Sequence, residues 1–544
     1  MRCGYPARSG GAFLTGGRDS YSASIGGNGY DGTLEDPGKQ YQSGMAILEP
    51  PLRQARDTEK PLGTHTDNPV RSTMEDGLDL TGCAVSVVFT EALDRELAEH
   101  LDKGPEQEDL TFAYWRPSRG KSRFSALLFE LAKPSDGDRI LQSNVAFTEQ
   151  YARRVLATLP KGSGIALLHS HLGPGWQGMS DDDVVAERDR LAGAVWGRSG
   201  FPLLGLTRGT DGTWSARLWI RRAPREYVRK DAATVRVVGD RLRISYNERL
   251  RPKTEIQDSQ VATASVWGDR AHAELARAHI GIVGLGSVGS IVAESLARTG
   301  FSRITLIDHD VIEKRNLDRT VGATAADVVG KLSKVQISAR NMSRCHTTPK
   351  LHLNVIPESI LTDNGWAAAM DCDAIVCCVD RPWPRYLLNA LSYAHLIPVV
   401  DGGIFAKVKE DGTPLHVDWR IHRVGPGQIC MLCLGALLRS DASLDRDGSL
   451  DNPDYINGLK PEERERYARR NVFAFSMSVA AHEVLQLIGM LTGMSRIGGL
   501  GPQMYHAYPG QMDVLPRTSC EAECEITALT SSAVDLTKQF RDYL

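Results

Sequence analysis

The sequence has no long apolar stretch and almost no net charge, and each absence excludes a class of protein. No apolar run of about 18 residues or more occurs, and a membrane-spanning helix needs one. The N-terminal segment also lacks the apolar core of a secretory signal peptide. Lys and Arg total 64 against 67 Asp and Glu, a net charge of −3, so no overall positive field attracts nucleic acid or an anionic membrane. We therefore expect a cytoplasmic protein without nucleic-acid or membrane partners.

The composition is that of a soluble globular protein, and the length allows several modules. At 544 residues, the chain is long enough for about three to five domains, or for two large ones with a tail. Its 10 cysteines are too sparse for a disulfide scaffold, which favours metal binding, catalysis or simple burial.

Four segments differ in pattern. Residues 1–78 are rich in Gly, Ser, Asp and Pro without hydrophobic periodicity, which predicts a disordered tail. Residues 79–246 alternate short apolar strands with helical stretches and predict an α/β domain with a central sheet. Residues 247–278 predict a linker and an entry helix. Residues 279–544 repeat strand, turn and helix, which predicts a doubly wound parallel sheet.

The first domain contains a predicted metal site. His169 and His171 are two residues apart in the predicted strand GIALLHSH, so their imidazoles share one face of the sheet. Ser180 stands where a helix N-cap is expected, which places Asp183 in the first helical turn. Two imidazoles and one carboxylate leave the fourth position of a tetrahedral zinc ion open, as in catalytic sites.

Hydrolysis at such a site also needs a base that accepts a proton from water and delivers it to the leaving amine. Glu108, at the start of the predicted strand EDLTFAYW, is the candidate, and Glu106 is the alternative. A pair of strand histidines beside an N-capped helix, without a metal, is the competing structural interpretation.

The motif HSHLGPGWQGMSDDD resembles the His-x-His and Ser-x-x-Asp motif of the JAB/MPN (JAMM) metalloisopeptidases. The resemblance implies that His169, His171 and Asp183 bind a catalytic zinc ion. It also implies that Glu108 is the base and that Ser180 supports the oxyanion. The sequence departs from the family pattern at Leu172, where a proline is common, and in a spacer before Ser-x-x-Asp that is one residue longer.

The second domain opens with a nucleotide-binding pattern. GLGSVG places Gly284, Gly286 and Gly289 between an apolar strand and a helix, and Asp308 ends the next strand. The glycines allow a phosphate to approach the backbone, the helix N-terminus favours an anion, and the acid can bind ribose hydroxyls. This pattern alone also suits an NAD-dependent oxidoreductase.

Charged residues further along favour nucleotidyl transfer over hydride transfer. Asp310, Asn316 and Arg319 follow in DHDVIEKRNLDRT, Lys334 lies in KLSKV, and Asp380 ends the apolar strand AIVCCVD. Basic side chains can neutralise a triphosphate and a carboxylate can hold Mg²⁺ during phosphoryl chemistry. Hydride transfer needs neither.

This stretch is similar to the ThiF-type adenylating domain of ubiquitin-activating enzymes and of bacterial sulfur-carrier activators. The resemblance implies ATP and Mg²⁺ as cofactors, with Asp308 on the ribose and Asp380 on magnesium. The same resemblance implies that Asn316, Arg319 and Lys334 bind the phosphates. Ser287 stands where the family pattern has the second glycine of a pair, and Thr320 where it has Gln. Relatives of this type also imply a homodimer.

Four cysteines form two pairs near the C-terminal end. Cys-x2-Cys on a turn supplies two thiolates to zinc, and a second pair completes a closed structural site. The pairs are Cys430 with Cys433 and Cys520 with Cys524. We expect one structural zinc ion there, as the same family resemblance also implies. Loosely buried thiols, or a reactive Cys430 or Cys433, are the alternatives.

Together the two resemblances imply an enzyme with two activities on one partner, the tail of a ubiquitin-like or sulfur-carrier protein. One half would cleave after the terminal glycine, and the other would adenylate that glycine. No cysteine occurs between Cys433 and Cys520, so the acyl-adenylate would pass to a conjugating or sulfur-donor partner. The alternatives are an NAD-dependent oxidoreductase and a non-catalytic scaffold that binds such a tail.

Overall fold

The computed structural model describes residues 80–103, 107–141, 145–408, 414–467, 470–494, 501–516 and 519–537. By its internal contacts the chain divides into two units, Met1–Asn68 and Pro69–Leu544. The described residues all belong to the second unit. The predicted tail and the alternative base Glu106 lie outside the described residues. The predicted domain boundaries stay predictions, because both large sheets lie in the one unit.

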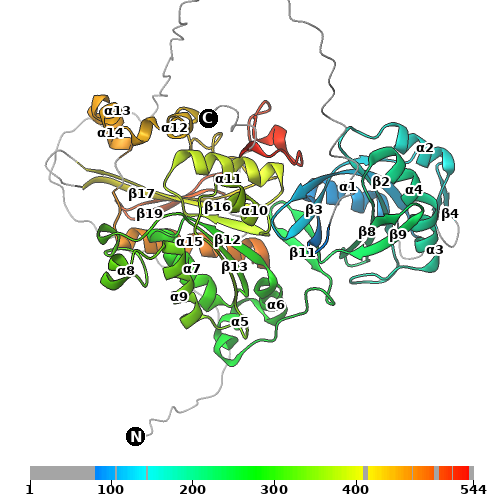
Figure 1. Ribbon diagram of the computed structural model, residues 1–544, viewed down its shortest axis with the longest axis horizontal. Helices are drawn as coiled ribbons and strands as arrows, with labels where there is room; N and C mark the ends of the chain where they lie inside the picture. Colours follow the sequence, from blue (N-terminus) through cyan, green and yellow to red (C-terminus); the bar gives the residue numbers. More distant parts are fainter. Residues whose placement is uncertain are drawn as a thin grey trace, which may run out of the picture. The chain divides into compact units, whose positions relative to one another are not determined.

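The first sheet has nine strands in the order β11-β10-β1-β3-β2-β6-β7-β8-β9. Figure 1 labels β2, β3, β8, β9 and β11 of this sheet. Strand β6 lies inside it, antiparallel to β2 and parallel to β7, and its seven residues are all buried. This explains why its sequence is nearly all apolar. The strands are β1 Ala84–Thr90, β2 Leu110–Arg119, β3 Arg123–Ala132, β6 Gly164–Ser170, β7 Leu203–Arg208, β8 Trp214–Ala223, β9 Glu226–Asp231, β10 Thr234–Val238 and β11 Leu242–Tyr246.

Helices cover both faces of this sheet. Leu97 of α1 packs with Val87 on one face, whereas Tyr151 of α2 and Val195 of α4 pack with Phe112 on the other. A small hairpin, β4–β5, forms a separate two-stranded sheet. The bounds are α1 Glu91–Leu101, β4 Arg139–Leu141, β5 Val145–Phe147, α2 Glu149–Ala157, α3 Asp181–Val184, the π-helical turn η1 Val185–Leu191 and α4 Ala192–Ser199.

The second sheet has eight strands in the order β14-β13-β12-β15-β16-β17-β18-β19. The first five are mutually parallel, and the chain moves outward from β12 in both directions, as a doubly wound sheet does. Strands β17 to β19 add an antiparallel extension, so the predicted parallel sheet is in fact mixed. The strands are β12 His279–Val283, β13 Arg303–Ile307, β14 His352–Ile356, β15 Ala374–Cys377, β16 Val399–Val408, β17 Pro414–Val424, β18 Gln503–His506 and β19 Gln511–Val514.

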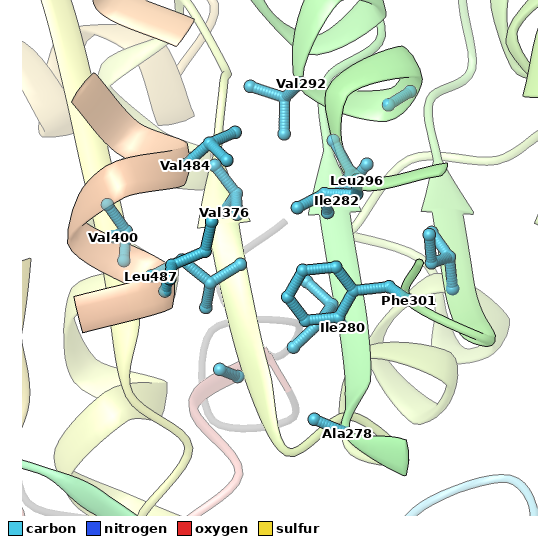
Figure 2. Close-up of a cluster of buried hydrophobic side chains, with 14 of the residues drawn as sticks. Ala278, Ile280, Ile282, Val292, Leu296, Phe301, Val376, Val400, Val484 and Leu487 are labelled. Carbon is cyan, nitrogen blue, oxygen red and sulfur yellow. The ribbon is translucent and has the colours of Figure 1, made fainter. Parts of the chain in front are cut away.

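The core of this second region lies between the sheet and its helices. Figure 2 shows Ile280 and Ile282 of β12 among side chains of helices α7 and α15, including Leu296 and Leu487. Helices α10 and α11 pack on the other face. The helices are α5 Val261–Trp267, α6 Asp269–Arg277, α7 Ser287–Thr299, α8 Ala325–Val329, α9 Lys334–Cys345, α10 Asp363–Ala369, α11 Pro382–Ala394, α12 Arg439–Arg446, α13 Pro453–Gly458, α14 Pro461–Arg466 and α15 Phe473–Thr492, with 3-10 turns η2 Asp258–Gln260, η3 Lys314–Asn316, η4 Ser449–Asp451 and η5 Thr527–Leu529.

Helix α15 is the single helix in the described ranges that is long and apolar enough to cross a membrane, judged by length and composition alone. The mean hydropathy of its most apolar window is 1.3, and 56% of that window is buried inside the protein. Its buried residues include Val479 and Leu487, which pack in the core of the second region. This burial is typical of a core helix.

Buried ion pairs join the two sheets. The Arg123 Nη1 atom of β3 lies 2.6 Å from Asp373 Oδ1, just before β15, and the Arg236 Nε atom of β10 lies 3.7 Å from the same oxygen. Asp373 Oδ2 accepts a hydrogen bond from the backbone N–H of His279 at 3.0 Å. Burial by itself would raise the pKa of the Asp373 carboxyl group. The positive charges of Arg123 and Arg236 outweigh this effect and keep the pKa below its usual range. One carboxylate therefore links strands of both sheets.

We expect Asp373→Ala to lower the free energy of unfolding by about 3–5 kcal/mol, because it leaves Arg123 and Arg236 buried without their carboxylate partner. Urea denaturation followed by circular dichroism measures this. Glu226→Ala is the control, since it removes a surface pair with Arg222 at 3.8 Å and should change stability by less than about 1 kcal/mol. Equal stability of the two variants would contradict the linking role of Asp373.

Candidate functional site

The glycine turn between β12 and α7 combines close packing with an open helix end. Gly284 has a φ of +89°, and a Cβ there would lie 2.7 Å from the carbonyl oxygen of Cys378. A Cβ on Gly289 would lie 1.8 Å from the oxygen of Gly284. At Gly286, by contrast, no described atom lies within 4 Å of an added Cβ. Two glycines are therefore required by packing, whereas the third leaves the backbone open to a ligand.

Gly286 is also the N-cap residue of α7, and within the described part of the chain no side chain caps this helix end. The first backbone N–H groups of a helix need acceptors, and the helix dipole adds partial positive charge there. A phosphate group supplies acceptors and negative charge together. This end of α7 therefore fits a nucleotide phosphate.

Asp308 directly follows β13 and holds the glycine turn in place. Its Oδ2 accepts a hydrogen bond from the N–H of Leu285 at 2.5 Å, and its Oδ1 accepts one from the N–H of Asp310 at 2.8 Å. The residue is 8% exposed, and burial raises the pKa of its carboxyl group. Each carboxylate oxygen keeps a second lone pair, so a ribose hydroxyl could still donate to it.

Lys334 is brought to the same place from the start of α9. Its Nζ lies 2.6 Å from Asp310 Oδ2, and its backbone N–H donates to the carbonyl of Asp310 at 2.9 Å. Only 12% of the Lys334 side chain is exposed. Asp308, His309 and Asp310 also lie close enough together to hold a cation. The ammonium group is thus fixed beside the glycine turn.

Asn316 and Arg319 make local contacts in this structure. Asn316 Oδ1 accepts from the N–H of Glu313 at 3.0 Å, as part of a capping box in η3. Arg319 Nη1 donates to the carbonyl of Arg315 at 2.8 Å and to Asp318 Oδ1 at 2.7 Å. To bind a phosphate, Arg319 would have to break these two hydrogen bonds and form new ones with the phosphate oxygens.

Asp380 is exposed and follows β15 by three residues. Because β12 and β15 are parallel neighbours, their carboxyl ends meet at the same edge of the sheet. This brings the Asp380 carboxylate to the edge where the glycine turn begins. Its placement fits a ligand for Mg²⁺.

A buried ionic cluster that the sequence motifs do not indicate lies next to this edge. The Arg385 Nε atom lies 2.9 Å from Asp401 Oδ1, and its Nη2 donates to the carbonyls of Val379 and Gly402 at 2.9 Å each. Arg420 pairs with the other oxygen of Asp401 at 2.6 Å. Burial opposes ionisation, but the two arginines lower the pKa of Asp401 to about 2. Isolated charges in apolar stretches were the one available signal, and they match no motif.

A first metal-ligand cluster lies at the end of β6. His169 Nε2 and His171 Nε2 are 3.1 Å apart, and they lie 3.2 and 3.3 Å from the two carboxylate oxygens of Asp183. Despite the opposing effect of burial, the two histidines hold the pKa of Asp183 well below its usual range. A hydrogen bond with Asp183 in turn raises the pKa of His171. Three ligand atoms converge on one point, which fits a zinc ion with an open fourth position.

Ser180 and Glu108 flank this cluster. Ser180 Oγ accepts from the N–H of Asp183 at 3.1 Å, and the Ser180 N–H donates to Asp183 Oδ2 at 2.7 Å. The serine is therefore the N-cap that orients the carboxylate. Glu108 is half-buried and precedes β2 by two residues, so it lies outside the strand that was predicted to begin with it. Strand β2 pairs with β6 so that Leu110 lies opposite His169, and the backbone N–H of Ser170 donates to the carbonyl of Asp109 at 3.0 Å. This pairing brings the backbone of Glu108 near the two histidines.

A second cluster contains the two cysteine pairs. Their sulfur atoms all lie within 4.8 Å of one another. Cys430 Sγ lies 3.7 Å from Cys524 Sγ, and Cys520 Sγ accepts from the N–H of Cys430 at 3.1 Å. Hydrogen bonds to the Cys520 sulfur lower its pKa to about 5, and the bond with Cys430 has the largest effect. Four thiol groups in this arrangement fit a structural zinc ion.

The fold and the first of these sites define an α/β domain of the nucleotide-binding type. Residues 257–509 match the model of the ThiF family. The C-terminal part of the chain is therefore a ThiF-family domain.

The chain is also similar to several curated proteins over part of its length. The chain is 34% identical over 142 residues to the tRNA threonylcarbamoyladenosine dehydratase of Escherichia coli (strain K12), covering 26% of this chain and 52% of the relative. It is 29% identical to the molybdopterin-synthase adenylyltransferase of the same organism, covering 30% and 60%. It is 28% identical to the ubiquitin-like modifier-activating enzyme 5 of Drosophila grimshawi, covering 31% and 44%. The chain thus spans about half the length of these relatives.

We expect Cys430→Ser to reduce the zinc content of the purified protein by about one equivalent and to lower its melting temperature, because a closed thiolate site loses a ligand. Plasma mass spectrometry and thermal denaturation measure the two effects. Cys345→Ser is the matched control, since Cys345 is half-buried at the end of α9 and outside the cluster. An unchanged zinc content in Cys430→Ser would contradict the four-thiolate site.

Proposed function

We propose that the ThiF-family domain binds MgATP and transfers its AMP group to the C-terminal carboxylate of a ubiquitin-like or sulfur-carrier protein. The observation that carries the proposal is the convergence of three features at one sheet edge. These are the uncapped N-terminus of α7, the Lys334–Asp310 pair and the Asp380 carboxylate. The relatives named as an adenylyltransferase and as a ubiquitin-like modifier-activating enzyme support this choice of reaction and partner.

The chemistry requires charge neutralisation more than covalent catalysis. A carboxylate oxygen of the tail attacks the α-phosphorus of ATP, the bond to the β-phosphate oxygen breaks, and pyrophosphate leaves with its electron pair. Lys334 and the N-terminus of α7 would stabilise the negative charge on the phosphates. Asp380 would hold Mg²⁺, which would neutralise the negative charge that develops on the phosphates.

Neither of the two competing functions explains all the features of this site. An NAD-dependent oxidoreductase would use the same glycine turn, yet hydride transfer needs no lysine held at the phosphates. A non-catalytic scaffold would bind a tail without any exchange of pyrophosphate. Since no cysteine lies between Cys433 and Cys520, the acyl-adenylate would pass to a thiol or sulfide of a partner protein.

We expect the purified protein to catalyse ATP–pyrophosphate exchange with a ubiquitin-like tail ending in Gly-Gly. Lys334→Ala should reduce the exchange rate by about 100-fold or more, because one fixed positive charge at the phosphates is lost. Lys350→Ala, which removes an exposed lysine just before β14, is the matched control and should keep the full rate. Exchange that survives in Lys334→Ala, or nicotinamide binding without exchange, would contradict the proposal.

We also propose a second activity, zinc-dependent cleavage after the terminal glycine of the same class of tail. The convergence of His169, His171 and Asp183 favours it, and the pairing of β2 with β6 brings the backbone of Glu108 near them. Zinc in this cluster would act as a Lewis acid that lowers the pKa of water and polarises a carbonyl group. Glu108 would accept the proton from water and deliver it to the leaving amine. Ser180 would orient Asp183 and could donate to the developing oxyanion.

For this second activity, Glu108→Gln should reduce cleavage of a tail fusion by about 100-fold to 10,000-fold, because the amide cannot accept the proton. Gel electrophoresis of the fusion over time measures the rate. The control is Glu130→Gln, an exposed glutamate on β3, which should cleave at the normal rate. Zinc-dependent cleavage by Glu108→Gln at the unaltered rate would exclude Glu108 as the base.

A further inference from the structure

A deeply buried ion pair is connected to the histidine cluster through Thr207. Glu187 of η1 is 0% exposed and Arg217 of β8 is 3% exposed. Arg217 Nε donates to Glu187 Oε2 at 2.9 Å, and Arg217 Nη2 donates to Glu187 Oε1. Trp219 Nε1 donates to Glu187 Oε2 at 2.7 Å. A pair this deeply buried costs desolvation, so apolar residues of similar size would often be as stable.

The pair continues toward the metal ligands. Arg217 Nη1 donates to Thr207 Oγ1 at 2.5 Å, and Thr207 Oγ1 lies 3.3 Å from His169 Nε2. That nitrogen is the same atom that faces Asp183 at 3.2 Å. The hydrogen-bond chain therefore ends at the nitrogen that would bind zinc, so the ion would replace Thr207 at this atom.

Glu187 also acts on the cluster through the backbone. Asp183 and Glu187 are four residues apart in the continuous helical segment formed by α3 and η1, and side chains at this spacing lie on one face of a helix. One carboxylate contacts the histidines and the other contacts Arg217. The segment is thus held to the sheet at two points.

Strand β7 is shaped to admit this arrangement. A Cβ on Gly205 would lie 2.4 Å from Glu187 Oε2, so only a glycine leaves room for the carboxylate. Thr207 is two residues further along and shares the same face of β7. In addition, η1 is π-helical, a local geometry that is frequent at functional sites.

From these contacts we propose that Glu187 and Arg217 are positioning residues for the histidine cluster. They hold the helical segment that carries Asp183 against the sheet, and so they keep this carboxylate at ligand distance from His169 before an ion binds and set the affinity of the cluster for zinc. The proposal rests on the zinc-dependent half of the proposed function. Groups that orient metal ligands in this way typically change metal affinity by about 10-fold to 100-fold.

The domain supplies a matched control on the other face of β7. Arg208 is adjacent to Thr207, so its side chain points to the opposite face, where it lies 3.3 Å from Asp94 Oδ1. Trp214 Nε1 donates to the same oxygen at 2.8 Å. This second buried set of acid, arginine and tryptophan lies on the opposite face of the strand from the histidines. Asp94→Asn therefore disrupts a comparable buried ion pair but leaves the contacts between Glu187 and Arg217 intact.

The test is the dissociation constant of Zn²⁺ for the full chain, measured by competition with a chromophoric chelator on folded protein. The equivalent of zinc that is absent from His169→Ala is the one followed, which separates it from zinc at the cysteines. We expect Glu187→Gln to weaken this binding by about 10-fold to 100-fold. Asp94→Asn should leave it within about twofold of the wild type, although its melting temperature also falls.

Arg217 gives an independent variant in case Glu187→Gln does not fold. Arg217→Lys keeps the positive charge but cannot bond both carboxylate oxygens of Glu187 as the guanidinium does, and it should weaken zinc binding by about 10-fold. The inference is overturned if the wild type binds this zinc and both Glu187→Gln and Arg217→Lys bind it equally well, or if Asp94→Asn weakens it as much. A wild type that binds no zinc lost in His169→Ala would instead overturn the proposed zinc-dependent function, and this inference with it.

Discussion

The ThiF-family domain depends on one geometric constraint: neighbouring parallel strands end at the same edge of their sheet. The glycine turn follows β12, Asp308 follows β13, and Asp380 follows β15, and these three strands are parallel neighbours. Residues almost a hundred positions apart in the chain are therefore brought to one edge. The hydrogen bond from the Leu285 N–H to Asp308 then joins the turn of one strand to the end of the next. A nucleotide at this edge would meet a helix N-terminus and charged groups already in place.

The histidine cluster is built on a different constraint, the alternation of side chains along a strand. His169 and His171 face the same side of β6, and the capping box of Ser180 and Asp183 turns a carboxylate toward them. Behind them, a chain of buried polar groups leads from Glu187 through Arg217 and Thr207 to His169. The two candidate sites thus share a principle. In each, backbone and buried hydrogen bonds fix the reactive groups before any ligand arrives.

Some of this could be predicted from the sequence because the signals are local. The period of two in GIALLHSH places both histidines on one face, and Ser-x-x-Asp is a capping pattern that depends on four consecutive residues. The α/β class follows from apolar strands that alternate with helices, and it is confirmed. The antiparallel extension β17–β19 was missed, because strand direction depends on where the chain returns, which no local pattern records. The position of Glu108 before β2 was also missed, since the first residue of a strand is decided by its pairing partners.

Other features depend on contacts between distant segments. Nothing near Arg217 in the sequence indicates Glu187, which lies 30 residues earlier, or the glycine at position 205 that makes room for it. The same holds for Asp373, which joins the two sheets through Arg123 and Arg236. The sequence by itself determined which segments form strands, helices and caps, because these depend on neighbouring residues. Only the tertiary structure decided which charges are buried together, because a buried charge is tolerated just where folding brings its partner.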